Sequence, residues 1–406
     1  MARYIPEDIL EEIRRKADIV ELVSSVTPVK KRGSSFWACC PFHKEKTASF
    51  SINQQRQIFY CFGCKKSGNI FHFVQDTQNT DFPGSVEWLA DRLGIIIPEE
   101  QHNMLAPDQR QARQQKRRDG MQLLQEAGAY FQENLQSPAA AIARNYLSAR
   151  GLSQEVIEQF QLGFSYESWD ALLQWALQKG YSRELLVDTG LCIAKEEQPE
   201  HCYDRFRGRL MFPILDEQGR LVGFSARSLD SAAKTAKYVN SPESAFFNKS
   251  EILYGMHLAR KEFRSTATAL LCEGQMDVIA CHQAGIKNAI AAQGTAFTEQ
   301  HATLLKRSTD HVTIIFDGDQ AGLDASLKSA EILLKAGLHT VVANLPEGQD
   351  PDSILNTGGP KALQQMLKNS LEAIPFAFNL SCQKHDYNLP EGKSAIVSDT
   401  LALVAV

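Results

Sequence analysis

The chain has 406 residues, of which 43% are hydrophobic and 22% are charged, and its formal net charge is −5. This length is enough for two to four domains, and the composition is typical of a globular protein. No apolar run reaches the roughly eighteen residues that a membrane-spanning helix needs, which excludes such a helix. Residues 1–20 alternate charge with Ile and Leu and lack a signal-peptide core, so we expect an amphipathic helix and a cytoplasmic protein.

Residues 1–100 form a first unit in which short strand-like runs follow the amino-terminal helix. The runs are "FWACC", "SFSI" and "QIFYCF", and two helical patterns, "GNIFHFVQDTQ" and "SVEWLADRLGI", come after them. Cys40-x2-His43 and Cys61-x2-Cys64 lie within this unit, separated by seventeen residues. Three thiolates and one imidazole at this spacing are the ligand set of a structural, tetrahedral Zn²⁺ site. Cys39 would need a three-residue spacer, which makes Cys40 the better ligand.

The nine cysteines do not favour a disulfide framework, because the chain has no export signal and five of them are scattered. We expect those five to be inert thiols in the interior. They are Cys192, Cys202, Cys272, Cys281 and Cys382.

Aromatic and basic residues surround the predicted zinc site. Such a mixture on a β surface suits stacking of single-stranded bases and neutralisation of phosphates, although each aromatic residue could equally fill the small core. The lysines are the better candidates for contact with DNA, because local charge governs phosphate binding. The aromatic residues are Trp37, Phe42, Phe50, Phe59, Tyr60 and Phe62, and the lysines that we predict to bind nucleic acid are Lys30, Lys44 and Lys46.

Residues 101–118 are rich in Gln and Arg, and we interpret them as a linker that continues into a helix. Residues 119–265 are mixed, with a helix capped by Ser153 and a β-hairpin around Glu217–Gly219. Residues 266–359 alternate short apolar strands with helices, which predicts a parallel α/β sheet. Residues 360–406 read as a helical segment that ends without a capping signal, so we expect it to be truncated.

Three acidic clusters follow predicted strands of the parallel sheet. Ligands of such sheets bind beyond the carboxyl ends of the strands, where carboxylates can hold Mg²⁺. Two ions about 4 Å apart can stabilise the attacking and leaving oxygens of a phosphoryl transfer. A single Asp such as Asp319 or Asp352 is more often a helix cap, but three clusters in order favour metal. The clusters are Glu273 with Asp277, Asp317 with Asp319, and Asp350 with Asp352. The "EGKS" at residues 391–394 is no phosphate-binding loop, because Tyr387 stands where that motif needs Gly.

Seven motifs in fixed order closely resemble those of bacterial DnaG-type primases. They are "CCPFHKEKTASF", "YCFGCKKSGN", "YDRFRGRLMFPI", "KYVNSPES", "CEGQMDVIA", "FDGDQAG" and "PEGQDPDS", and the last three are similar to the Toprim fold. The resemblance implies a multidomain α+β protein. It has a β-rich zinc-ribbon DNA-recognition domain (1–100), a linker (101–118), an amino-terminal polymerase subdomain (119–265), a central Toprim sheet (266–359) and a helical segment (360–406). Gln275 and Ala48 depart from the family pattern without altering a ligand.

The resemblance also implies a function, which is the synthesis of short RNA primers on single-stranded DNA by two-metal nucleotidyl transfer. Glu273, Asp317 and Asp319 would be catalytic and, with Asp350 and Asp352, would hold two or more Mg²⁺ or Mn²⁺ ions. Asp277 would support Glu273. The residues that would line a basic groove or grip nucleotide phosphates are Arg205, Arg209, Arg227, Lys237 and Asn240.

The implied partners are template DNA, ribonucleoside triphosphates, a single-strand-binding protein and the replicative helicase, the last through a carboxy-terminal domain not present in this sequence. We expect a monomer that is associated with the nucleoid and not with a membrane. Two rival functions stay open. One is a Toprim topoisomerase or nuclease; a topoisomerase needs a tyrosine nucleophile, and Tyr203, Tyr238 and Tyr254 are present but none lies in a motif typical of that role. The other is a non-catalytic zinc-ribbon regulator, which would leave the acidic clusters without a function.

Overall fold

The computed structural model describes residues 7–32, 35–45, 47–95, 107–195, 198–230, 236–294 and 296–404. The chain divides into two compact units between Gln114 and Gln115. Lys46, predicted to contact nucleic acid, lies outside the described residues. None of the described helices combines the length and apolar character that crossing a membrane requires.

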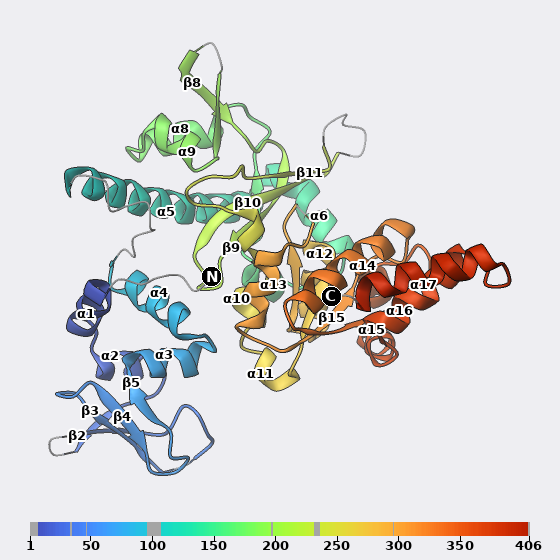
Figure 1. Cartoon of the computed structure of the whole chain (residues 1–406). Coiled ribbons are helices and arrows are strands. Elements are labelled where there is room, and N and C mark those ends of the chain that lie inside the picture. The colour runs from blue at the N-terminus through green and yellow to red at the C-terminus, as the bar shows by residue number, and fades with distance from the viewer. Residues whose placement is uncertain are drawn as a thin grey trace. The chain divides into compact units, whose positions relative to one another are not determined.

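The first unit is an antiparallel five-stranded sheet, β1-β2-β3-β4-β5, with four helices (Figure 1). Each of the last three helices has an N-cap side chain, from Asp18, Asn69 and Asp81, that accepts a backbone N–H of the first turn. The elements are α1 (Glu7–Lys16), α2 (Ile19–Ser24), β1 (Lys30–Arg32), β2 (Ser35–Ala38), β3 (Phe50–Asn53), β4 (Ile58–Cys61), β5 (Ser67–Asn69), α3 (Ile70–Gln78) and α4 (Phe82–Arg92).

Strand alternation divides the aromatic residues of this sheet between its two faces. Phe50 and Phe59 are buried with Ile52 in the core, where their rings stack with centroids 4.9 Å apart. On the opposite face, Lys30 pairs with Trp37, Trp37 with Ser51, Ser51 with Tyr60, and Tyr60 with Ser67, which makes one row across all five strands.

The long helix α5 (Pro107–Leu135) contains the boundary between the units, and the second unit begins within it at Gln115. Residues 107–118 of the predicted linker are therefore helical, because Gln, Arg and Ala favour a helix even where no apolar stripe marks it. Residues 101–106 lie outside the described part of the chain. The following elements are η2 (Pro138–Ala140), α6 (Ala141–Ala149), α7 (Gln154–Gln159), β6 (Gly163–Ser165), α8 (Ala171–Gln178), α9 (Arg183–Asp188), β7 (Cys192–Lys195), β8 (Gln198–Asp204), β9 (Arg209–Leu215), β10 (Leu221–Ser228) and β11 (Tyr238–Asn240).

An antiparallel sheet in the order β11-β10-β9-β6 organises this part of the second unit, and β7 pairs with β8 separately. The hairpin predicted around Glu217–Gly219 is the β9–β10 turn, and Ser153 caps α7 as predicted, accepting the Val156 N–H. Apolar residues on one face of β9 and β10 pack under α5, α8 and α9.

The remaining elements build a six-stranded sheet in the order β12-β14-β13-β15-β16-β17. They are η3 (Lys249–Glu251), β12 (Leu253–Tyr254), α10 (Met256–Ala259), α11 (Phe263–Thr266), β13 (Ala269–Cys272), α12 (Gln275–Gln283), β14 (Ala289–Ala292), α13 (Glu299–Lys306), β15 (His311–Ile315), α14 (Gln320–Lys335), β16 (His339–Val342), α15 (Pro351–Lys368), β17 (Leu371–Glu372), α16 (Ala373–Lys384) and α17 (Pro390–Val404).

The sheet is mixed, whereas the sequence predicted a parallel one. The four central strands are parallel, but the two-residue edge strands β12 and β17 pair antiparallel with β14 and β16. These edge strands lie outside the predicted range 266–359, and β17 interrupts the predicted helical segment 360–406. Non-helical backbone at Gly359 (φ 67°) kinks α15 next to that predicted boundary.

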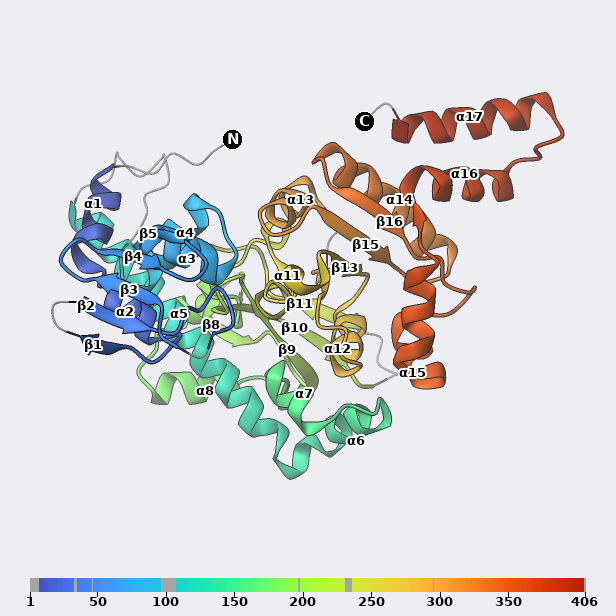
Figure 2. The ribbon, with the colours of Figure 1, turned by 90° about the horizontal axis from the view of Figure 1, so that it is seen from below.

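Helices cover both faces of the six-stranded sheet (Figure 2). Val278 of α12 and Ile354 of α15 pack on one face in a core shared with β6 and β9. Leu305 of α13 and Leu333 of α14 pack on the other, together with Phe376 of α16. Strands β13, β15 and β16 are parallel neighbours, so their carboxyl ends lie at the same edge of the sheet. The segments that follow these strands therefore start at that edge.

Candidate metal centres and nucleic-acid surface

Cys40, His43, Cys61 and Cys64 form one cluster in the first unit, with ligand atoms that all lie within 4.8 Å of one another. The Cys40 and Cys64 Sγ atoms are 3.8 Å apart, and Cys61 Sγ is 3.9 Å from His43 Nδ1. A tetrahedral ion with Zn–S bonds of about 2.3 Å places two sulfurs about 3.8 Å apart. The donor set and its spacing therefore suit Zn²⁺. Cys39 is not in the cluster, as its spacing predicted.

Backbone donors support the thiolates of this cluster. The Phe42 N–H donates to Cys40 Sγ and the Cys64 N–H to Cys61 Sγ, each at 3.4 Å. Burial raises the pKa of Cys61, but the hydrogen bonds around its Sγ, that from the Cys64 N–H among them, outweigh this effect and bring the pKa down to about 7. Thiolate is the form that binds metal, so this environment favours the ligand state of Cys61.

An exposed aromatic group lies on the outward face of the five-stranded sheet. Trp37 and Phe62 stack with ring centroids 5.7 Å apart, and Tyr60 meets Phe62 edge-on at 4.9 Å. Phe62 is 55% exposed and Tyr60 is 39% exposed. Half of the aromatic residues considered from sequence thus face outward, next to the exposed Lys30 in the same row.

In the second unit, three carboxylates follow adjacent parallel strands. Glu273 comes directly after β13, and Asp317 and Asp319 follow β15. The Asp317 N–H donates to Glu273 Oε2 at 3.3 Å, which places the glutamate on the same edge as the two aspartates. The sequence-based expectation that these clusters meet is therefore satisfied for the first two.

Gly318 connects the third cluster to the other two. Its N–H donates to the Gln349 carbonyl at 2.9 Å, next to Asp350. A Cβ at Gly318 would lie 2.1 Å from the Pro346 carbonyl oxygen. Only glycine therefore allows the Asp317–Asp319 turn to approach the loop that carries Asp350 so closely.

The crowding of these carboxylates raises their pKa values. Burial first, then the charges of Glu273, Asp350 and Asp319, raise the pKa of Asp317 to about 6, and Lys237 opposes them. Burial and the charge of Asp317 raise the pKa of Asp277 to about 8. Like charges gathered in this way favour a bound cation.

The aspartates also have the helix-capping role that the sequence left open. Asp319 Oδ1 accepts the Gly322 N–H at 2.8 Å, and Asp350 Oδ1 accepts the Ser353 N–H at 2.6 Å, so these residues cap α14 and α15. Asp277 Oδ2 accepts the Gly274 N–H at 3.1 Å and supports the Glu273 turn through the backbone. The second oxygen of a capping carboxylate stays available to a cation.

Asp352 differs from the other acidic residues because it is buried in an ion pair with Arg150. Sequence reasoning missed Arg150, which stands 202 residues earlier in the chain. The guanidinium groups of Arg150 and Arg227 lie 5.4 Å and 4.7 Å from the Tyr146 ring centroid, and Arg227 also donates to the Tyr238 hydroxyl at 2.8 Å. These residues form a cationic layer next to the acidic edge.

The other predicted nucleotide-binding residues occupy different environments. Asn240 pairs with Ser225 across β10 and β11, and its buried Oδ1 accepts no hydrogen bond within the described residues. Arg205 Nε donates to the Gly190 carbonyl at 2.8 Å, and the buried Arg209 donates to the Ala236 carbonyl at 3.0 Å. The guanidinium groups of both arginines thus donate hydrogen bonds to backbone carbonyls. Contact of these arginines with phosphate stays a prediction.

Arg207 was not singled out from the sequence. Its guanidinium lies 4.0 Å from the ring centroid of Trp169, which is 64% exposed. An exposed ring stacked with a cation is typical of single-stranded nucleic-acid surfaces. Of the tyrosines weighed as nucleophiles, Tyr254 is buried and Tyr238 is bound by Arg227, whereas Tyr203 is half-buried and lies against the Trp169 ring.

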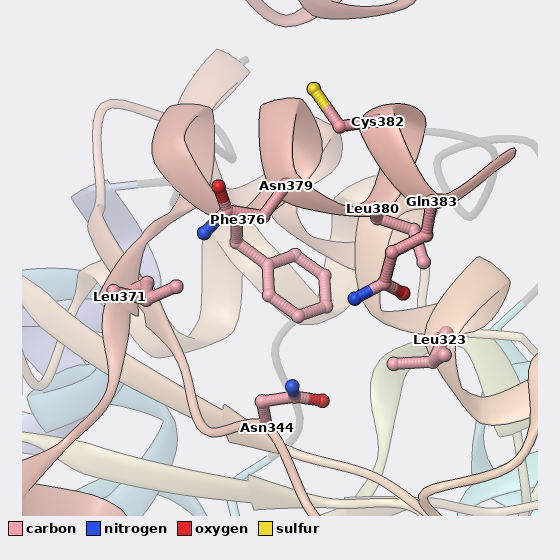
Figure 3. Close-up of a pocket in the computed structure, with 8 residues that line it drawn as sticks. All are labelled: Leu323, Asn344, Leu371, Phe376, Asn379, Leu380, Cys382 and Gln383. Atoms are coloured by element: carbon pink, nitrogen blue, oxygen red, sulfur yellow. The ribbon is translucent and has the colours of Figure 1, made fainter. Parts of the chain in front are cut away.

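A pocket of about 270 Å³ lies between α16, the start of α14 and the chain after β16. Figure 3 shows the Phe376 ring above Asn344, with Leu323 and Gln383 at its side. Its eight lining residues include no carboxylate and none of the predicted basic residues. None of the acidic residues described above is among them.

Comparison with known proteins matches three segments of the chain to family models. Residues 5–104 match the CHC2 zinc finger, residues 130–260 the N-terminal domain of the DNA primase catalytic core, and residues 270–355 a Toprim-like domain. The DNA primase of Escherichia coli strain K12 is 36% identical over 408 residues, which cover 100% of this chain and 69% of that protein. The chain belongs to the DnaG-type DNA primases.

Solved primase structures support the same family assignment. The zinc-binding and RNA polymerase domains of the Aquifex aeolicus primase match with a TM-score of 0.63 and 29% identity, over 98% of this chain and 95% of that one. A DnaG catalytic domain bound to single-stranded DNA matches with a TM-score of 0.63 and 36% identity, over 72% of this chain and 91% of that one. This primase is a DNA-directed RNA polymerase that synthesises RNA primers, with a zinc site at Cys40, His43, Cys61 and Cys64 and a Toprim domain that implies divalent-metal catalysis.

Proposed function

We propose that Glu273, Asp317, Asp319 and Asp350 hold the two divalent ions of primer synthesis at the carboxyl edge of the six-stranded sheet. The observation that carries this assignment is the hydrogen bond from the Asp317 N–H to Glu273 Oε2, which joins two clusters 44 residues apart. The bond from the Gly318 N–H to the Gln349 carbonyl brings the third cluster to the same place. Carboxylate oxygens are the ligands that Mg²⁺ and Mn²⁺ prefer.

The ions, when bound, lower the pKa of the primer 3′-hydroxyl and neutralise the triphosphate of the incoming ribonucleotide. The chain's own contribution is to fix the carboxylates in advance. One carboxylate oxygen of Asp319 and one of Asp350 each accept a backbone N–H, which fixes the orientation of these side chains. Groups oriented before the reaction need no reorganisation during it.

Asp352 has a different place in this proposal from the one that the sequence predicted. Its ion pair with Arg150 and its burial support a role next to the ion site, where it holds the arginine, and we assign metal ligation first to the other four acids. Arg150, Arg227 and Lys237 would then compensate the charge of the triphosphate. Lys237 already acts on Asp317, whose pKa it lowers against the larger effect of burial.

Single-stranded template is assigned to two aromatic surfaces. One is the outward face of the zinc unit, with Trp37, Tyr60 and Phe62, and the other is the Trp169–Arg207 stack of the second unit. Exposed rings accept any base by stacking, and neighbouring cations neutralise the backbone. Lys30 lies in the same row as Trp37, and the exposed Lys44 follows His43 in the zinc-binding turn.

We also propose one role for each domain that the sequence predicts. The zinc unit would read template, residues 119–265 would bind nucleic acid and nucleotide, and residues 266–359 would carry the ions. A replicative helicase and a single-strand-binding protein are the further partners, and a monomer is the expected state. The DnaG catalytic domain bound to single-stranded DNA supports, by similarity, a template surface in the second unit.

The test is primer synthesis by Asp317→Ala on a single-stranded template with labelled ribonucleotides. We expect at least a hundredfold loss of synthesis with template affinity within twofold, because Asp317 touches the ions and not the template. The matched control is Asp310→Asn, an exposed aspartate at the opposite end of the same strand, β15. Synthesis by Asp317→Ala within threefold of the parent chain would overturn the assignment.

A further inference from the structure

Glu45 lies inside the zinc-binding turn and bonds to three different parts of the site. Its Oε1 accepts the Cys40 N–H at 2.6 Å and the Ser49 N–H at 3.2 Å. Its Oε2 accepts the Ser49 hydroxyl at 2.6 Å and lies 3.2 Å from His43 Nε2. The Glu45 side chain is 11% exposed, so it is committed to this network and not to solvent.

The His43 ring has a defined direction in this network. Its Nδ1 faces the cluster, 3.9 Å from Cys61 Sγ, while its Nε2 faces Glu45. A Cβ at Gly63 would lie 2.7 Å from His43 Nε2 and 2.8 Å from Cε1. Glycine at this position therefore leaves room for the imidazole edge that points to the carboxylate.

Ser49 extends the same network to another ligand. Its hydroxyl, which donates to Glu45, lies 3.3 Å from Cys61 Sγ. One carboxylate is thus connected to Cys40 through the backbone, to His43 through the ring, and to Cys61 through Ser49. Cys64 is the one ligand of the four that these bonds do not reach.

We propose that Glu45 is the positioning residue of the zinc site, which holds His43 with Nε2 protonated and Nδ1 directed to the ion. A ligating histidine that donates its other N–H to a carboxylate is fixed in tautomer and orientation and is a more basic ligand. The bonds to Cys40 and Ser49 hold the turn while the ion is exchanged. This role concerns metal retention and is independent of the carboxylates at the catalytic edge.

The first experiment measures zinc affinity of the full chain by competition with a chromogenic chelator. Glu45→Gln keeps the size of the side chain and an oxygen that can accept the Cys40 N–H, but the NH2 group that replaces Oε2 can accept neither from His43 Nε2 nor from the Ser49 hydroxyl. We expect about tenfold weaker zinc binding in Glu45→Gln and up to a hundredfold in Glu45→Ala. The control Glu21→Gln, at an exposed position in α2, should stay within twofold.

The second experiment reads the ring directly, by long-range proton–nitrogen NMR of the zinc-loaded chain, with His43→Asn to assign the signal. Metal-bound Nδ1 and protonated Nε2 are expected. Metal-bound Nε2 would overturn the proposal, and so would zinc affinity of Glu45→Gln within twofold of the parent chain. If Glu45→Ala does not fold, Glu45→Gln and the NMR spectrum of the parent chain still decide. Neither readout depends on primer synthesis, so failure of the catalytic assignment leaves this test intact.

Discussion

The backbone N–H of Asp317 donates to Glu273 Oε2 at 3.3 Å. The two residues follow different strands, β13 and β15, which are parallel neighbours in the sheet. This bond holds the glutamate over the turn that presents Asp317 and Asp319, so that a cation placed there meets oxygens from both strands.

Gly318→Ala should damage the catalytic edge without removing any carboxylate. The added methyl group would meet the Pro346 and Leu345 carbonyl oxygens at 2.1 and 3.0 Å, so the Asp350 loop must move. We expect a loss of about 2 kcal/mol in the free energy of unfolding and at least a tenfold loss of primer synthesis. Urea denaturation and a primer assay measure the two effects.

Gly285→Ala is the matched control for this variant. It lies beyond the far end of α12 with φ 83°, and no atom of the described residues stands within 4 Å of the position that the added methyl group would take, so its cost is backbone strain alone. We expect about 1 kcal/mol of destabilisation and unchanged synthesis. Equal losses of synthesis in the two glycine variants would show that general destabilisation, and not loop displacement, is responsible.

Arg150→Met should leave Asp352 buried without its partner. Removing one member of a largely buried pair costs about 3 kcal/mol, because the remaining charge is poorly solvated. Adding Asp352→Asn should recover part of that loss in the double variant. Denaturant midpoints of the two single variants and the double variant measure the coupling, and strictly additive effects would contradict the ion pair.

Phe62→Ala and Trp37→Ala should weaken binding of single-stranded DNA. Each removes one ring of an exposed stack, and base stacking contributes about 1–3 kcal/mol per base. We expect five- to a hundredfold weaker affinity by fluorescence anisotropy with zinc content unchanged. Val26→Ala, another exposed apolar residue of the same unit, is the control. Unchanged affinity in both ring variants would remove this face from the template surface.

The second unit should lose stability in acid because of the buried His282 and the half-buried His257. Burial lowers the pKa of His257 and of His282 to about 4, below the ordinary value of 6.5. As pH falls from 6.5 to 4, these histidines are protonated in the unfolded chain but stay neutral in the folded chain. The free energy of unfolding therefore decreases. Each histidine contributes on the order of 3 kcal/mol to this loss.

His282→Gln tests the acid effect directly. Its amide can still donate to the Ala289 carbonyl, which His282 Nε2 contacts at 3.0 Å, but it does not titrate. Urea denaturation between pH 7 and pH 4 should show a pH slope smaller by about one proton, whereas the exposed His311→Gln should keep the slope. An unaltered slope in His282→Gln would contradict its assignment as a buried neutral group.

The parts of both sites that are local in sequence could be predicted, because spacing and strand order fix them. The zinc ligands lie in two tight turns, and the acidic residues follow apolar strands whose carboxyl ends meet. The requirement for glycine at position 318 could not be predicted in this way. It arises because the loop that follows another strand approaches the Gly318 backbone too closely for a Cβ.

The parts that depend on distant contacts could not be predicted. Arg150 has no sequence signal that connects it to Asp352, 202 residues away. Arg205 and Arg209 carry a basic motif, yet their guanidinium groups bind backbone carbonyls, which charge patterns do not reveal. The edge strands β12 and β17 have two residues each, too few to show alternation.

Anomalous diffraction from crystals of the chain soaked in Mn²⁺ tests the central assignment most directly. We predict two peaks about 4 Å apart, bounded by Glu273, Asp317, Asp319 and Asp350, and their loss in Asp317→Ala. The absence of any peak at this edge in the parent chain, with ions bound elsewhere, would contradict the account.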